Sequence, residues 1–207
     1  MQIERHSGAA RAAGEESLQH VFERVGAVRH GHFELSSGRH SATYVQCALV
    51  LQFPEIADRL GRELAAKFSD IAVDCVASPA LGGILVGQEV ARGLGVRAVF
   101  VERDSSGQMA LRRGFSFRAG ERVLVAEDVW TTGGSTRETM GVVEEAGGRP
   151  VAAAALIDRS GGRLDLAVPT RALMDLDIAS YEPYECPQCR AGEPLTKPGS
   201  HFIRAES

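Results

Sequence analysis

The chain has 207 residues, of which 44% are apolar and 24% are charged, and its formal net charge is −4. This length suits one domain whose core needs no disulfide or metal to stabilise it, and the composition excludes disorder over the bulk of the chain. The negative charge argues against a general nucleic-acid binder, and no apolar run approaches the roughly 20 residues that span a bilayer. Because no signal peptide is visible, the four cysteines indicate reduced thiols, and we expect a cytoplasmic protein without membrane or nucleic-acid partners.

The first quarter of the chain predicts short elements followed by a strong helix. Apolar residues at helical spacing predict a helix over 15–25, and residues 31–45 resemble two short strands around a Ser-Ser-Gly turn. Pro54 opens a helix in which apolar residues recur every four positions as far as Phe68. We interpret residues 1–14, which precede these elements, as a flexible leader to a single domain.

The remainder of the chain alternates between strands and helices. The predicted strands cover 72–77, 97–101, 122–127, 151–157 and 171–176, and the predicted helices cover 84–94 and the residues after Ser135 to about Ala146. This alternation is typical of an α/β domain with a central parallel sheet flanked by helices. The last thirty residues are rich in Pro, Gly and Cys and predict a loop-bound tail.

Three unusual segments, 78–83, 102–114 and 128–135, follow predicted strands. Ligands of parallel sheets bind beyond the carboxyl ends of the strands, and these ends meet at one edge. The three segments are therefore expected to form one site.

The strongest chemical signal is the string Val123-Leu-Val-Ala-Glu-Asp-Val-Trp-Thr-Thr-Gly-Gly-Ser-Thr136. Its glycines allow a tight turn that aims several backbone N–H groups at one point, and a helix N-terminus adds partial positive charge. The hydroxyl donors are Thr131, Thr132, Ser135 and Thr136. We expect a cup for a phosphate dianion, with two acids beside it that suit hydroxyl groups or a metal ion. An ordinary N-capped helix start is the alternative interpretation.

This string resembles the phosphoribosyl-diphosphate (PRPP) motif of the type I phosphoribosyltransferases. Other segments narrow the resemblance to the orotate phosphoribosyltransferase branch of that family: 31–41, 78–84, 111–115, 157–159 and the Cys-Pro-Gln-Cys sequence of the tail. The resemblance covers roughly residues 17–200. It implies the type I phosphoribosyltransferase fold within 15–207, with an N-terminal hood mainly at 15–50 and a Pro/Cys-rich C-terminal tail at 178–207.

The resemblance implies an enzyme that transfers the phosphoribosyl group of PRPP to orotate, giving orotidine 5′-monophosphate and pyrophosphate in pyrimidine biosynthesis. It also implies a homodimer with shared active sites. Mg²⁺ is the expected cofactor, held mainly by substrate rather than by protein ligands. The alternatives are another base-specific enzyme, such as a purine phosphoribosyltransferase, and a non-catalytic PRPP-sensing regulator.

Residues with implied roles cluster in the three segments. Glu127 and Asp128 would hold the ribose hydroxyls, and the turn after them would hold the 5′-phosphate. The implied PRPP-binding set is Arg103, Glu127, Asp128, Val129, Trp130, Thr131, Thr132, Gly133, Gly134 and Ser135, and the implied pyrophosphate loop is Ser78, Pro79, Ala80, Leu81, Gly82 and Gly83. Thr131 and Arg159 match positions that contact orotate, and a surface arginine after a strand is the alternative for Arg159. Trp130 is expected to pack rather than to stack on a ligand.

The positively charged residues of this chain differ from those of many members of the family that it resembles. Segment 102–114 matches a flexible loop that carries lysines and a histidine in those relatives, whereas here it carries Arg103, Arg112 and Arg113. Gly82 and Ser36 stand where those relatives have lysines. Arg112 and Arg113, with Asp128, are therefore the catalytic candidates, and a solvated arginine pair on a hairpin is the alternative for the two arginines.

Two further groups of residues suggest metal chemistry only weakly. His30, His32 and His40 lie close in sequence, but no Cys or acid completes a recognisable ligand spacing, so we expect a scaffold role. Cys186 and Cys189 form half of a zinc-ribbon signature without a second cysteine pair. A structural knuckle or free thiols is the default expectation, and zinc shared across a dimer is a remote alternative.

Overall fold

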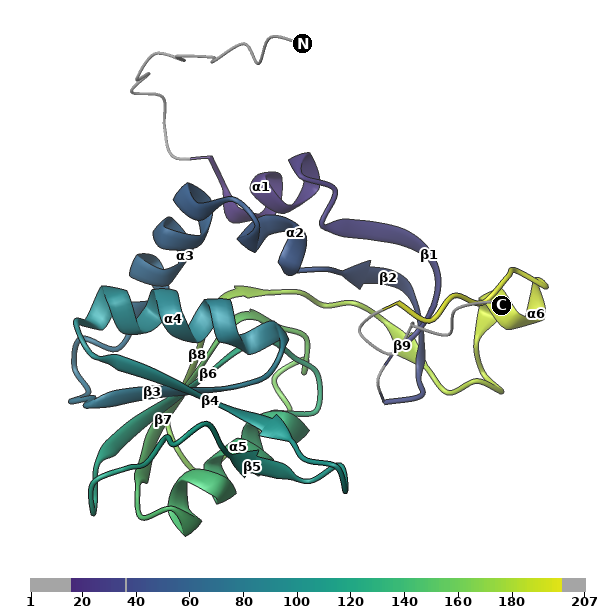
Figure 1. Cartoon of the computed structure of the whole chain (residues 1–207). Coiled ribbons are helices and arrows are strands. Elements are labelled where there is room, and N and C mark those ends of the chain that lie inside the picture. Colours follow the sequence, from purple (N-terminus) through teal and green to yellow (C-terminus); the bar gives the residue numbers. More distant parts are fainter. Residues whose placement is uncertain (1–15, 36, 199–207) are drawn as a thin grey trace, which may run out of the picture.

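A six-stranded, mostly parallel sheet forms the centre of the molecule (Figure 1). The computed structural model describes residues 16–35 and 37–198, so the predicted leader, Ser36 and the end of the tail lie outside the described residues. In spatial order the strands are β5 (Met109–Leu111), β4 (Arg97–Arg103), β3 (Cys75–Pro79), β6 (Arg122–Trp130), β7 (Arg149–Asp158) and β8 (Thr170–Asp175). Only β5 runs antiparallel to its neighbour, which confirms the predicted α/β class.

Helices cover both faces of this sheet because alternate strand residues point to opposite sides. The main core lies between the sheet and helices α3 (Pro54–Ala66) and α4 (Gly82–Leu94), and buries side chains such as Val76 and Leu124. Helix α5 (Gly134–Glu145) packs on the other face. None of the helices within 16–35 and 37–198 combines the length and the apolar character needed to cross a membrane.

The predicted hood is a small second sheet that extends from the body as an arm (Figure 1). Its strands are β1 (Val28–Glu34), β2 (His40–Val45) and β9 (Ser180–Tyr181), and the short helices around it are α1 (Leu18–Arg24), α2 (Ala48–Leu51) and α6 (Pro187–Arg190). Strand β9 comes from the C-terminal tail and pairs with β2. Segments about 140 positions apart therefore build one unit.

Several predicted boundaries are wrong because pairing partners extend the strands. Strand β6 continues past Glu127 to Trp130, since Trp130 still pairs with Asp158 of β7, so both acids lie within the strand. Segment 102–114 is not a simple loop, because β4 and β5 pair within it as a hairpin. The tail is not loop-bound throughout, because it contributes β9 and α6.

Candidate functional site

The predicted convergence of three segments at one sheet edge is confirmed. Strands β4, β3 and β6 are parallel neighbours, so the residues that follow them emerge side by side. The segment after β3 is shorter than predicted, since Pro79 still belongs to the strand and α4 already begins at Gly82. The peptide bond between Ala80 and Leu81, which link the two elements, is cis.

The turn between β6 and α5 has the backbone form that a phosphate cup needs. Gly133 adopts a left-handed conformation with φ +73°, and a Cβ there would lie 2.4 Å from Leu164 Cδ1. Any larger residue at this position would be both strained and overlapped. Helix α5 begins at Gly134 without a side-chain cap, so its first N–H groups have no acceptor within the helix. They are available to an anion.

Arg137 holds this turn in place. Its guanidinium donates to the carbonyl oxygen of Thr132 at 2.6 Å and to that of Asp165 at 2.8 Å. It thereby joins the cup to the segment that follows β7. The sequence analysis did not single out this residue, although it directly follows the PRPP-like string.

Glu127 is held inside the site by a chain of hydrogen bonds. The indole N–H of the buried Trp130 donates to Thr136 Oγ1 at 3.0 Å, and Thr136 Oγ1 donates to Glu127 Oε2. Burial, opposed in part by the Thr136 hydrogen bond and reinforced by the Asp128 charge, raises the pKa of Glu127 to about 7. Trp130 packs in the core as expected and fixes this acid indirectly.

Asp128 faces the start of α4. Its Oδ1 accepts the N–H of Val129 at 2.9 Å, and burial raises the pKa of its carboxyl group. A Cβ on Gly82 would lie 2.6 Å from Asp128 Oδ2. Because Gly82 has no side chain, it lets the Asp128 carboxylate approach the backbone closely.

The raised pKa of Glu127 predicts a pH-dependent loss of stability. Below pH 4.5 the carboxyl group is protonated in both the folded and the unfolded chain, whereas between pH 4.5 and about 7 only the unfolded chain ionises. The free energy of unfolding of the ligand-free protein should therefore fall across this window by about 3 kcal/mol. Glu127→Gln keeps an acceptor for Thr136 and should lose this contribution, so that its free energy of unfolding, measured by urea unfolding at stepped pH, falls less across the window. Parallel pH profiles for the two proteins would contradict the assignment.

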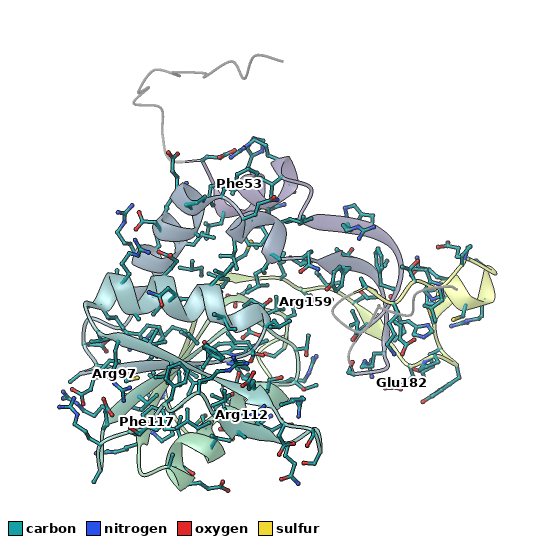
Figure 2. All side chains as sticks on the ribbon, in the orientation of Figure 1. Phe53, Arg97, Arg112, Phe117, Arg159 and Glu182 are labelled. Atoms are coloured by element: carbon teal, nitrogen blue, oxygen red, sulfur yellow. The ribbon has the colours of Figure 1, made fainter. Side chains whose placement is uncertain are left out.

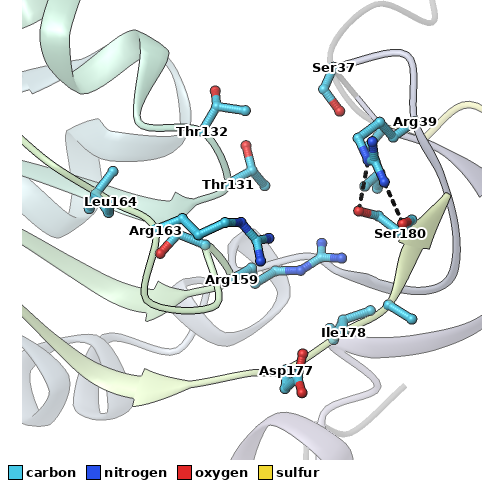
Figure 3. Close-up of a pocket in the computed structure, with 13 residues that line it drawn as sticks. Ser37, Arg39, Thr131, Thr132, Arg159, Arg163, Leu164, Asp177, Ile178 and Ser180 are labelled. Carbon is cyan, nitrogen blue, oxygen red and sulfur yellow. Dashed lines mark hydrogen bonds between the residues drawn. The ribbon is translucent and has the colours of Figure 1, made fainter. Parts of the chain in front are cut away.

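A pocket of about 550 Å³ lies between the body and the arm, and Thr131 and Thr132 form part of its wall (Figure 3). Figure 2 shows Arg159 at this junction. The other residues that line the pocket come from the hood, from the segment after β7 and from the tail: Leu35, Ser37, Arg39, Arg159, Ser160, Arg163, Leu164, Asp177, Ile178, Ala179 and Ser180. The structure thus places the two predicted orotate contacts, Thr131 and Arg159, in one pocket.

Arg159 lines this pocket with unused hydrogen-bonding capacity. Its Nε is buried and has no hydrogen-bond partner among the described residues, and burial lowers the pKa of its guanidinium. A buried donor without a partner costs about 1–3 kcal/mol, more when it is charged. An anionic ligand with an in-plane pair of oxygen atoms would satisfy it.

The opposite wall is formed by contacts that sequence reasoning missed. Arg39 donates from Nε to Ser180 Oγ at 3.0 Å and from Nη2 to the Ser180 carbonyl oxygen at 2.6 Å (Figure 3). It also pairs with Glu182. Arg163, which follows β7, reaches the same pocket. The sequence could have indicated Arg163 as a site residue, because it follows the carboxyl end of a parallel strand, where ligands bind.

The three arginines of segment 102–114 lie near acids of this chain. Arg113 forms two hydrogen bonds with Glu102, both at 2.9 Å, whereas Arg112 approaches Glu102 only to 3.7 Å. Both side chains are more than half exposed. Arg103 pairs with Glu138 on α5 at 2.9 Å. No contact of these arginines with the cup is present within the described residues.

The three histidines between positions 30 and 40 separate into two groups. His32 and His40 lie within 4.8 Å of Cys186 and Cys189 in a mutual cluster, whereas His30 is exposed and contacts Thr43. The fold therefore completes the half signature of the tail with residues of the hood. The sequence analysis missed this set because its two halves are about 150 positions apart.

Comparison with known proteins agrees with this arrangement. Residues 50–177 match the family model described as "Phosphoribosyl transferase domain". The orotate phosphoribosyltransferase of Pelotomaculum thermopropionicum is 54% identical over 88% of this chain and 96% of its own length, and that of Caldanaerobacter subterraneus is 48% identical over 91% and 99%. This chain belongs to the orotate phosphoribosyltransferase family. The crystal structure of orotate phosphoribosyltransferase from Aeropyrum pernix has a TM-score of 0.62 at 27% identity, and the match covers 77% of this chain and 94% of that one.

Membership of the orotate phosphoribosyltransferase family confirms the type I fold implied by the sequence resemblance. The domain model matches the body of the molecule and stops at Asp177. Most of the arm, including Arg39 and Ser180, lies outside that match. The wall of the pocket formed by Arg39 and Ser180 therefore lies outside the residues that match the general domain model.

Proposed function

We propose that this enzyme transfers the 5-phosphoribosyl group from PRPP to orotate, releasing pyrophosphate and orotidine 5′-monophosphate. The observation that carries the proposal is the position of Thr131, which belongs both to the phosphate cup and to the pocket of Arg159. One ligand can therefore occupy both parts at once. A nucleotide with an anionic base has this shape and charge.

The cup supports binding of the 5′-phosphate and of the ribose. Backbone N–H groups at the start of α5 and the hydroxyl groups of the turn suit a phosphate dianion. Asp128 and Glu127 lie beside the cup and can accept hydrogen bonds from the ribose 2′ and 3′ hydroxyls. A second phosphate would be repelled by these acids, so the diphosphate of PRPP extends toward the segment from Ser78 to Gly83.

The pocket supports binding of the base. The Arg159 guanidinium can pair with the orotate carboxylate through two parallel hydrogen bonds. Orotate is already an anion, so the protein need supply neither a nucleophile nor a strong base. Its residues orient the two substrates for displacement at ribose C1 through an oxocarbenium-like state, and stabilise the charge that develops on the leaving diphosphate.

Phosphoribosyltransferases generally use Mg²⁺. The residues present fit such an ion, because Asp128 offers carboxylate oxygens at the edge where the diphosphate would lie. The bound ion would neutralise part of the diphosphate charge. We assign it mainly to substrate and water oxygens, as Mg²⁺ usually is.

Two further features complete the proposal. The protein acts in the cytoplasm, in keeping with four cysteines of which none forms a disulfide in the structure. It is a homodimer in which the hairpin of β4 and β5 reaches the partner's site. The exposure of Arg112 and Arg113 at this hairpin supports such a reach.

The direct test of this proposal is the consumption of orotate, followed by its ultraviolet absorbance after addition of PRPP and Mg²⁺. Hypoxanthine, adenine, xanthine and uracil are offered as competing bases. We expect orotate to be consumed only when PRPP is present, with little competition from the purines. Preferential use of a purine would assign the chain to a different base, and no turnover of any base would favour a PRPP-binding regulator.

The phosphate cup can be tested at Gly134. A Cβ at this position would have its nearest neighbour at 3.6 Å, Thr132 Oγ1, so a larger side chain is tolerated by the fold but projects toward the cup. Gly134→Val should raise the KM for PRPP by about 10-fold or more through the loss of one or two N–H contacts.

The matched control for Gly134→Val is Gly141→Ala in the same helix. A Cβ on Gly141 would have no neighbour within 4 Å, and alanine is the better helix former. This control should leave the KM for PRPP unchanged. Equal PRPP affinity of the Gly134→Val and Gly141→Ala proteins, measured by calorimetry, would show that the 5′-phosphate does not bind at this turn.

A further inference from the structure

Four potential metal ligands from opposite ends of the chain meet in the arm. His32 lies on β1 and His40 begins β2, whereas Cys186 precedes α6 and Cys189 lies within it. One ligand atom from each lies within 4.8 Å of all the others. His32, His40 and Cys186 are buried, and only Cys189 is exposed. We call these four residues the histidine–cysteine cluster.

The distances within this cluster match the edges of a metal tetrahedron. His32 Nε2 and His40 Nδ1 are 3.1 Å apart. Cys189 Sγ lies 3.2 Å from His40 Nδ1 and 3.5 Å from His32 Nε2, and Cys186 Sγ lies 3.4 Å from His32 Nε2. Zinc–nitrogen and zinc–sulfur bonds of about 2.05 and 2.3 Å imply tetrahedral edges of about 3.3 Å between two nitrogens and about 3.6 Å between nitrogen and sulfur. Four of the six ligand–ligand distances thus agree with a single tetrahedral ion, and all six lie within 4.8 Å.

The tautomer of His32 is also set for metal binding. Its Nδ1 lies 2.9 Å from the carbonyl oxygen of Glu193, an atom that can only accept a hydrogen bond. Nδ1 therefore carries the proton, and the lone pair of Nε2 faces His40 and the two sulfur atoms. A backbone carbonyl that orients a histidine in this way is a recurring partner of metal-bound imidazoles.

The backbone around the cluster ties the tail to the hood. Thr196 exchanges hydrogen bonds with the strand that carries His32, donating to the His32 carbonyl oxygen and accepting from the N–H of Glu34, both at 2.8 Å. Gln188, between the two cysteines, donates to the Gly31 carbonyl oxygen at 3.0 Å. These contacts hold the cysteine turn over β1.

We propose that His32, His40, Cys186 and Cys189 bind one structural zinc ion within each chain. Two thiolates and two imidazoles in a tetrahedral array favour zinc over the oxygen-seeking ions, and four protein ligands leave no open position for catalysis. The ion would fasten the tail to the hood near the Arg39–Ser180 contact, and so support one wall of the base pocket. This site is separate from any Mg²⁺ at the diphosphate.

The metal content of the full-length protein tests this proposal. The protein is purified in reducing, chelator-free buffer, and zinc per chain is measured by mass spectrometry after removal of loosely bound ions. We expect about one zinc per chain, and a drop of about 10-fold or more for Cys189→Ser, since one lost thiolate breaks the ligand set. Cys189 is the exposed ligand, so its replacement disturbs packing least.

His30→Gln is the matched control. His30 is the third histidine of the same segment, but it is exposed and outside the cluster. It should keep the zinc content of the wild type. Retention of zinc by Cys189→Ser at the wild-type level would overturn the proposal.

A second measurement keeps the test decisive even if Cys189→Ser fails to fold. Zinc-stripped, reduced wild-type protein is titrated with Co²⁺, which gives strong visible absorption and a thiolate charge-transfer band in a tetrahedral site with two sulfur ligands. We expect both features to saturate at one Co²⁺ per chain and to be displaced by zinc. Wild-type protein that carries no zinc and lacks this cobalt spectrum would show that the cluster is a metal-free hydrogen-bonded or disulfide-forming group.

Discussion

Replacing Arg159 by alanine is expected to abolish most of the preference for orotate over uracil, a base that lacks the carboxylate. Two charge-assisted hydrogen bonds of about 1.5–3 kcal/mol each set the scale, so the KM for orotate should rise by about 10²-fold or more. The KM for PRPP should change far less, because Arg159 lies in the base pocket and not in the turn that begins α5. Steady-state kinetics with each substrate varied in turn provides the measurement.

Arg159→Lys is the matched control for the geometry of this contact. Lysine keeps the positive charge but loses the planar fork, so its orotate KM should lie between those of the wild type and the alanine variant. Competitive inhibition by uracil should be similar in all three proteins. If the ratio of orotate to uracil affinity is the same in wild type and Arg159→Ala, the carboxylate is not bound by Arg159.

Removal of the Arg112 side chain is expected to lower kcat by about 10²-fold, the scale of a lost donor that stabilises charge in the transition state. We expect the two candidate arginines of the hairpin, Arg112 and Arg113, to differ in their effect. Arg113 is fixed on Glu102 by a pair of hydrogen bonds, whereas Arg112 approaches Glu102 only to 3.7 Å and is the freer to reach a leaving diphosphate. Arg113→Ala should therefore reduce kcat much less than Arg112→Ala.

Mixing variants tests whether that arginine acts in the partner's site. Asp128→Asn alone should impair PRPP binding or turnover, with an effect of about 1.5–3 kcal/mol from one charge-assisted hydrogen bond. In a verified heterodimer of Arg112→Ala and Asp128→Asn chains, shared sites leave one of the two intact, so up to about half of the activity should return. Activity no higher than that of the two parents would place both groups in the same chain's site.

At the sheet edge that carries the phosphate cup, the sequence predicted the chemistry of the residues better than the exact course of the backbone. The Thr-Thr-Gly-Gly-Ser turn was recognisable because the steric freedom of glycine and the helix start are local properties, and the structure places it at Gly133 and Gly134 as expected. The continuation of β6 through Glu127 and Asp128 was not predictable from the string. It depends on pairing with β7, which is a contact between segments about thirty residues apart.

The arm contains contacts that could not be predicted from the sequence. Arg39 and Ser180 form one wall of the pocket, and their contact spans 141 positions. The half signature at Cys186 and Cys189 likewise appeared incomplete, because its partners lie on β1 and β2. Spacing rules detect ligands within one segment, whereas these pairs are created only when the tail adds β9 to the hood sheet.

The central claim is that the phosphate cup and the Arg159 pocket are two parts of one site. Calorimetric titration of orotidine 5′-monophosphate tests it most directly, because this product carries both the 5′-phosphate and the carboxylated base. We predict that Gly134→Val and Arg159→Ala each weaken its binding by about 10-fold or more, the scale of lost hydrogen bonds to charged groups, while Gly141→Ala binds as the wild type does. Wild-type affinity in either of the first two variants, with the fold intact, would contradict a single site shared by the cup and the pocket.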